Sequence, residues 1–173
     1  MTEIKVFAPA SIANLSCGYD ILGVCLDNIG DEITVRKTKK KGITIKKVLG
    51  QKLSTDISIN VAGVSATALL NESKVDCGFE IEIHKGIKPG SGIGSSSASA
   101  AGAVVGINHL LGNPYTREEL IAFAMEGERV ACGTAHADNV SPVLLGGFTL
   151  VRSVNPLDVV TLNSPLELVV TII

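Results

Sequence analysis

The chain has 173 residues, of which 46% are hydrophobic, and its formal net charge at pH 7 is −2. This length and composition are typical of one globular domain with a buried core, and they argue against an intrinsically disordered chain. The slight acidic balance argues against a nucleic-acid-binding surface, and no uncharged apolar stretch is long enough to predict a membrane span.

The first third of the chain predicts short strands. Residues 4–8 alternate apolar and polar positions, and we expect Pro9 to close that strand. Residues 31–38 and 43–48 alternate in the same way on either side of a lysine-rich tip. We expect these two segments to pair as a hairpin with one buried face.

Helical patterns dominate the middle of the chain. Apolar residues recur at helical spacing over residues 60–72, and residues 78–84 (GFEIEIH) form a further strand with one apolar face. Residues 95–111 are so rich in alanine and glycine that the predicted helix must pack closely against a sheet. Thr116 and Glu119 form a capping box that begins a third helix, which runs to about residue 131.

The last third predicts a short helix near residues 139–144 and a strand at 146–153. Residues 166–173 (LELVVTII) predict a final strand, and an unprotected apolar strand at the end suggests that a further domain follows. Strands and helices in this order predict an α+β domain rather than an alternating parallel sheet.

The four cysteines, at positions 17, 25, 77 and 132, form no CxxC pair. We therefore expect neither a zinc site built on such pairs nor a thioredoxin-like motif. Because no basic and apolar leader precedes the first predicted strand, we expect a cytoplasmic protein with reduced thiols.

A glycine-rich loop precedes the helix predicted at 95–111. Gly90, Gly92 and Gly94 permit positive φ and let backbone N–H groups approach an anion. The serines at 95–97 occupy the first helical turn, where free N–H groups favour phosphate and a hydroxyl can reach Mg²⁺. The glycine spacing matches neither the dinucleotide-binding motif nor the Walker motif. The loop predicts a phosphate cradle of another kind, and the alternative is a flexible serine-rich loop before a buried helix.

Three separated segments carry a family resemblance: 8–26 (APASIANLSCGYDILGVCL), 89–102 (PGSGIGSSSASAAG) and 126–151 (EGERVACGTAHADNVSPVLLGGFTLV). In order and spacing they resemble the small-molecule kinases of the GHMP family, and most closely the members that phosphorylate homoserine. The resemblance covers almost the whole chain but only about half of such an enzyme. This chain has Ser16 and Cys17 where the family more often shows Gly and Pro.

The resemblance implies an N-terminal, ATP-binding domain with the fold shared by part of ribosomal protein S5. We expect residues 1–173 to be this domain, with a ferredoxin-like C-terminal domain beyond them and the active site between the two. The implied substrates are ATP and L-homoserine, and the implied product leads to threonine. No nucleic-acid or membrane partner is implied, and homodimer formation stays open.

The resemblance further implies that the triphosphate of ATP lies against the glycine-rich loop and that Ser96 and Glu128 hold Mg²⁺. A hydroxyl and a single carboxylate suit an ion that keeps several waters in its octahedral shell. The resemblance also implies that the segment containing Asn60 contacts the adenine or the ribose of ATP. The implied ATP-binding residues are Asn60, Pro89, Gly90, Ser91, Gly92, Ile93, Gly94, Ser95, Ser96, Ser97 and Ala98.

On the acceptor side, Asn14 and Asp20 match family positions that contact the amino acid, and a carboxylate there can pair with its ammonium group. HADN at 136–139 places His136 beside the acceptor and leaves two mechanisms open. Asp138 acts as a general base, or Asn139 hydrogen-bonds the hydroxyl and no strong base is required; we favour the second.

Two alternatives remain at the level of sequence. The first is another GHMP kinase, acting on mevalonate, shikimate or a sugar, and HADN together with Asn14 and Asp20 argues against it. The second is a non-catalytic binding module that keeps the S5-like scaffold, and the three aligned polar segments argue against that.

Overall fold

The computed structural model describes residues 1–163 and 168–171. It confirms a mixed α+β fold, in which helices cover a sheet. The elements in chain order are β1 (Glu3–Leu15), β2 (Gly18–Thr38), β3 (Gly42–Leu49), α1 (Val61–Ser73), β4 (Gly78–His84), α2 (Ser95–Leu110), α3 (Arg117–Cys132), α4 (Val140–Leu145), β5 (Phe148–Val154) and β6 (Leu157–Leu162).

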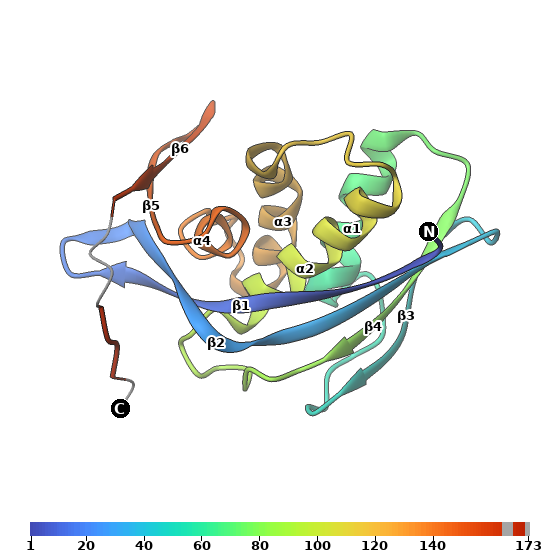
Figure 1. The fold of residues 1–173 in the computed structure, drawn as a ribbon, viewed down its shortest axis with the longest axis horizontal. Helices are drawn as coiled ribbons and strands as arrows, with labels where there is room; N and C mark the ends of the chain where they lie inside the picture. The colour runs from blue at the N-terminus through green and yellow to red at the C-terminus, as the bar shows by residue number, and fades with distance from the viewer. Residues whose placement is uncertain (164–167, 172–173) are drawn as a thin grey trace.

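The sheet has the strand order β3-β4-β2-β5-β6, and β1 pairs along β2. All pairs are antiparallel except β3 with β4. Figure 1 shows the four helices gathered on one face of the sheet, while the turn between β1 and β2 extends past them towards β5. The opposite face of the sheet carries no helix within the described residues.

The predicted hairpin between residues 31–38 and 43–48 is wrong. Strand β4 lies between β2 and β3, so that Ile83 is paired with Ile33 on one side and with Val48 on the other. The apolar side chains of β4 are fully buried, which suits a central strand. β3 carries two exposed lysines, Lys46 and Lys47, and charged side chains of this kind are typical of a sheet edge.

Pro9 does not close the first strand. β1 continues to Leu15, with a register shift between Pro9 and Ser11 against β2. Proline is tolerated at an edge or a bulge because its missing N–H group is not needed for a strand ladder there. The longer strand positions Asn14 far from the N-terminus, near the helices α2 and α4.

The four predicted helices are confirmed within a few residues, including the capping box at Thr116 and Glu119. Strand β6 was not predicted. Of the strand predicted at 166–173, residues 168–171 are described and have no strand structure, and the other residues lie outside the described part of the chain.

Helix α2 occupies the centre of the core and confirms the close packing predicted from its small residues. An added Cβ at Gly102 would lie 2.5 Å from a side-chain atom of Ile33, and one at Gly106 would lie 2.5 Å from Val35. The helix backbone therefore rests directly on β2, while α1, α3 and α4 surround its other sides. This packing fixes the N-terminal end of α2, which carries the serines at 95–97.

Candidate functional site

A cavity of about 540 Å³ opens at the N-terminal end of α2. It brings together segments that are far apart in the sequence. Its lining residues are Asn14, Leu53, Val61, Lys85, Pro89, Gly90, Gly92, Gly94, Ser95, Ser96, Ser97, Ser99, Glu128, Ala131 and Asn139. Most of the predicted phosphate loop, the predicted metal ligands and two predicted acceptor residues therefore face one space.

The glycine-rich loop has the backbone conformation that the sequence predicts. Gly90, Gly92 and Gly94 have φ values of 77°, 77° and 67°, a region that side chains disfavour. Gly94 is the N-cap of α2 and no side chain caps this helix in the described structure. The first N–H groups of α2 are thus free of intrahelical partners and lie at the positive end of the helix dipole, beside the cavity.

Glu128 extends from α3 to the same cavity and is only 4% exposed. Its Oε1 has no hydrogen-bond partner among the described residues, and neither has the buried hydroxyl of Ser97. Burial raises the pKa of the Glu128 carboxyl, the nearby Asp138 carboxylate adds to that effect, and the hydroxyls of Ser96 and Ser97 oppose it. These hydroxyls are near the carboxylate, but no hydrogen bond of normal geometry joins either of them to Oε1.

This donor set fits Mg²⁺, for which one carboxylate and one hydroxyl suffice when waters and substrate oxygens complete the shell. A buried carboxylate oxygen without a partner is costly unless a cation or a proton neutralises it. No group of three or more His, Cys, Asp or Glu side chains in the described residues could hold a metal ion. Ser96 and Glu128, the pair that the resemblance implies, both line the cavity and stay the candidate ligands of a cation.

The predicted acceptor residues form a second cluster next to the cavity. The Asp20 N–H donates to Asn14 Oδ1 at 2.8 Å, and both residues have positive φ, 57° and 60°. His136 Nδ1 lies 3.5 Å from Asp20 Oδ1. Of these three residues only Asn14 lines the cavity, and both side chains of the His136–Asp20 pair are partly exposed.

Asn139 and Asp138 have different environments although they are neighbours. Asn139 lines the cavity, and its Oδ1 accepts a hydrogen bond from Ser11 Oγ at 2.9 Å. Asp138 is buried, and its Oδ1 accepts from the Asn139 N–H at 3.0 Å. Burial raises the pKa of the Asp138 carboxyl, partly offset by that hydrogen bond. Asn139 is thus the one of the two that faces the cavity.

Four predicted ATP-binding residues do not line the cavity. Asn60 is the N-cap of α1: its Oδ1 accepts from the N–H groups of residues 62 and 63, and its Nδ2 donates to Ser54 O at 2.7 Å. Its amide is thus engaged in capping α1, and its contact with adenine or ribose stays a prediction. Ser91, Ile93 and Ala98 belong to the loop or to α2 but contribute no lining atoms.

Comparison with known proteins supports the resemblance. The family model of the GHMP kinases N terminal domain matches residues 60–147, half of the chain. The chain belongs to the GHMP kinase family. Among similar GHMP kinases, a homoserine kinase of Chloroherpeton thalassium is 43% identical over 180 residues, covering 97% of this chain and 56% of the relative. A homoserine kinase of Methanococcus maripaludis is 45% identical over 175 residues, covering 99% of this chain and 58% of the relative.

Solved structures of GHMP kinases agree with this assignment. The crystal structure of a homoserine kinase from Cytophaga hutchinsonii superposes with a TM-score of 0.90 at 50% identity, covering 95% of this chain and 53% of that one. The Methanococcus jannaschii mevalonate kinase gives a TM-score of 0.71 at 16% identity, which indicates a shared fold alone. The chain spans a little over half the length of the relatives that it matches. No described helix is both long enough and apolar enough to cross a membrane.

Sequence reasoning missed two charged residues of this GHMP kinase domain, Lys85 and Asp31. Lys85 lines the cavity and forms a buried ion pair with Asp31. Burial lowers the pKa of the Lys85 ammonium, and the Asp31 carboxylate opposes that effect. The strand period contained the signal, because Asp31 shares the inward face of residues 33 and 35, and Lys85 that of residues 81 and 83.

The apolar part of the cavity lining also escaped prediction. It consists of Leu53, Val61 and Ala131, which come from three different segments. No short motif marks such a wall, because its residues are far apart in the sequence and meet only in the folded chain. An apolar wall beside a phosphate-binding loop suits the face of a nucleobase.

Proposed function

We propose that the protein containing this chain is a homoserine kinase, which transfers the γ-phosphoryl group of ATP to the side-chain hydroxyl of L-homoserine. The observation that carries the proposal is the convergence, in one cavity, of the free amides of α2, the unpartnered Glu128 and the amide of Asn139. The similarity to homoserine kinases along almost the whole chain supports the choice of acceptor.

The proposed nucleotide site uses the loop and the first turn of α2. The free N–H groups at residues 95–97 would bind phosphate oxygens, since amides at a helix N-terminus favour anions. Ser96 and Glu128 would hold Mg²⁺, which neutralises the charge of the triphosphate when it is bound. The apolar wall of Leu53, Val61 and Ala131 would contact the base.

The proposed acceptor site lies between Asn14, Asp20 and Asn139. The Asp20 carboxylate would pair with the ammonium group of homoserine. Asn14 would fix the backbone of Asp20, whose N–H donates to Asn14 Oδ1, and His136 would orient the carboxylate. The Asn139 amide would donate a hydrogen bond to the acceptor hydroxyl and align it with the γ-phosphorus. Ser11 supports this arrangement, since its hydroxyl donates to Asn139 Oδ1 and leaves the amide NH₂ for substrate.

The environment of Asp138 favours transfer without a strong general base. Asp138 is buried, its Oδ1 is occupied by a backbone N–H, and it does not line the cavity. The hydroxyl proton would leave late, to an oxygen of the transferred phosphoryl group, as a loose transition state permits.

We also propose that a ferredoxin-like domain follows residue 173 and completes the acceptor pocket. The chain spans a little over half of the homoserine kinases that it matches. The groups that bind the carboxylate of homoserine would come from that domain. A search for arginines in the residues that follow would test this part of the proposal.

A substrate panel tests the proposed function. The full-length protein is incubated with Mg·ATP and L-homoserine, mevalonate, shikimate or galactose, and ADP release is measured. We expect kcat/KM to be highest for L-homoserine, and Asn139→Ala to lower kcat by about 100-fold, within the range for loss of a key transition-state contact. Asn71→Ala, an exposed amide at the end of α1, is the matched control and should leave kcat unchanged. Preference for another alcohol, or no ATP turnover at all, refutes the proposal.

A further inference from the structure

A buried ion pair lies beneath the glycine-rich loop. The side chain of Lys85 is 1% exposed and that of Asp31 is 0% exposed, and Lys85 Nζ contacts Asp31 Oδ2. Asp31 comes from β2, while Lys85 directly follows β4 and precedes the loop. The pair therefore joins the sheet to the segment that leads into the loop.

Asp31 holds the chain where it enters the loop. Its Oδ1 accepts hydrogen bonds from the Gly86 N–H at 3.0 Å and from the Ile87 N–H at 3.1 Å. Its Oδ2 accepts from Ser99 Oγ at 2.9 Å, in addition to Lys85. Both carboxylate oxygens are thus occupied, one by the loop entry and the other by α2.

Lys85 holds the chain where it leaves the loop. Its ammonium donates to Ser95 O at 2.7 Å and to Ser99 Oγ at 2.9 Å, besides Asp31. An ammonium group has three N–H donors, and these three protein acceptors account for all of them. Ser95 Oγ in turn donates to Ile87 O at 3.1 Å, which ties the exit of the loop to its entry.

Between these two ends, few backbone hydrogen bonds hold the loop, and Ile93 packs against the hydrophobic core. Within the described residues, the backbone hydrogen bonds of the segment 88–94 outside α2 are Ser91 N–H to Lys88 O and Ser11 N–H to Ile93 O, at 3.2 and 3.3 Å. Its three glycines have positive φ, and glycine leaves the unconstrained backbone many conformations. The distance between the two ends is therefore one of the constraints on the shape of the loop, beside the contacts of Ile93.

We propose that Lys85, Asp31 and Ser99 form a positioning unit that sets the spacing of the two ends of the loop and thereby the affinity for the triphosphate. The inference rests on the proposed function. The unit acts through backbone geometry rather than through the charge of Lys85, because Asp31 offsets that charge and the protein accepts all three ammonium protons. Removing one partner of a buried pair leaves an uncompensated charge and also lowers stability, so folding has to be measured beside nucleotide binding.

Three variants test the unit in the full-length protein: Lys85→Met, Asp31→Asn and Ser99→Ala. Binding of Mg·ATP is measured by calorimetry, the KM for L-homoserine by a coupled assay, and folding by circular dichroism. We expect the first two variants to bind ATP at least about tenfold more weakly, equivalent to the loss of about 1.4 kcal/mol. The KM for homoserine should change by less than about twofold, since the acceptor residues touch none of these side chains.

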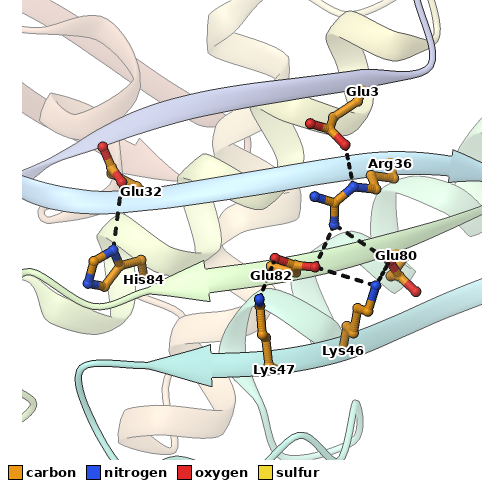
Figure 2. A network of polar contacts seen from close by, with 8 residues as sticks. All are labelled: Glu3, Glu32, Arg36, Lys46, Lys47, Glu80, Glu82 and His84. Carbon is orange, nitrogen blue, oxygen red and sulfur yellow. Dashed lines mark hydrogen bonds and ion pairs between the residues drawn. The ribbon is translucent and has the colours of Figure 1, made fainter.

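A matched control lies on the opposite face of the same sheet. Figure 2 shows Glu82 of β4 between Arg36 of β2 and Lys47 of β3, and the Lys47–Glu82 distance is 3.2 Å. Lys47 is half-exposed, and pairs of this kind contribute little. Lys47→Met should leave both the ATP affinity and the homoserine KM unchanged.

Hydrogen exchange separates a positioning role from a structural one. In the Lys85 and Asp31 variants, amides of residues 86–97 should exchange faster than in the unchanged protein, while those of α3 should not. If both variants fail to fold, Ser99→Ala decides, because it removes one hydroxyl and leaves the ion pair in place. We expect it to weaken ATP binding by at least about threefold.

The outcomes distinguish the two proposals. If the unchanged protein binds no ATP, the proposed function fails. If it binds ATP and the folded variants bind ATP equally well, the proposed function stands and the positioning unit is refuted. Equal losses in ATP affinity and homoserine KM would also refute the unit, because they would indicate a general loss of structure.

Discussion

Glu128 offers the sharpest test of the site, because its proposed role and its effect on stability oppose each other. The residue is 4% exposed, and its Oε1 has no hydrogen-bond partner in the described structure. Leaving a buried polar group unsatisfied costs about 1–3 kcal/mol, and more for a charged group. Glu128→Gln keeps the shape and removes the charge, so we expect it to stabilise the metal-free protein by about 1–2 kcal/mol at neutral pH.

The sign of the pH dependence follows from the raised pKa of Glu128. Below the ordinary pKa of a glutamate, both the native and the unfolded state hold the proton, and the unchanged protein has no charge to bury. As pH rises through the ordinary pKa and then through the raised one, stability is lost. The advantage of Glu128→Gln should therefore be small at low pH and largest above the raised pKa. Asp138 and His136 act on this carboxyl in opposite directions, and both stay in place in the variant.

Thermal unfolding without Mg²⁺, followed between about pH 4 and pH 8, measures this effect. For a domain of this size each kcal/mol shifts Tm by about 2–4 °C. The same variant should lose Mg²⁺-dependent phosphoryl transfer, and Mg²⁺ should no longer raise its Tm. Glu126→Gln is the matched control, since Glu126 lies on the same helix, is 43% exposed and pairs with Arg129. A less stable Glu128→Gln at neutral pH, or one with full activity, would refute this reasoning.

Three further predictions concern the loop, the acceptor cluster and the core. Gly94→Ala should abolish ATP binding, because its Cβ would overlap the Ser11 hydroxyl. Gly90→Ala has open space around the added Cβ and should lower stability by only about 1 kcal/mol, the cost of its positive φ. Calorimetry measures ATP binding and urea unfolding measures stability for both variants, and equal effects would contradict the overlap. Asp20→Asn should raise the KM for homoserine by at least about tenfold without changing the KM for ATP; steady-state kinetics in which both constants move together would contradict its role. Leu69→Ala, in the fully buried part of α1, should destabilise the protein by about 2–5 kcal/mol in urea unfolding, and a loss below 1 kcal/mol would contradict the tight packing.

The helices could be predicted from the sequence because their signals are local. The Thr116 and Glu119 capping box lies within one turn, and the small residues of α2 indicate close packing by themselves. Strand pairing depends on contacts between distant segments, and alternation in 43–48 identified a strand without its partner. β4 occupies the central place next to β2, and the alternation in its sequence does not distinguish this place from the edge place of β3.

The candidate site shows the same limit. The glycine-rich loop and Glu128 were predicted from one motif and one resemblance, and the structure brings them to one cavity. The side chain of Asn60 caps its own helix, α1. No sequence motif distinguishes such a cap from a residue that contacts a ligand. The alternation of inward and outward positions in the strands could have predicted Lys85 and Asp31, because each places a charged residue at an inward position.

The contact of Gly102 and Gly106 with β2 has a consequence for how a nucleotide is received. No Cβ fits at Gly102 or Gly106 without colliding with Ile33 or Val35, so the backbone of α2 packs directly on the sheet. The amides at its tip therefore stand in their final positions before any anion arrives. Under the proposed function, the entropy cost of arranging these amides would be met during folding, and binding of a triphosphate would order little beyond the short loop.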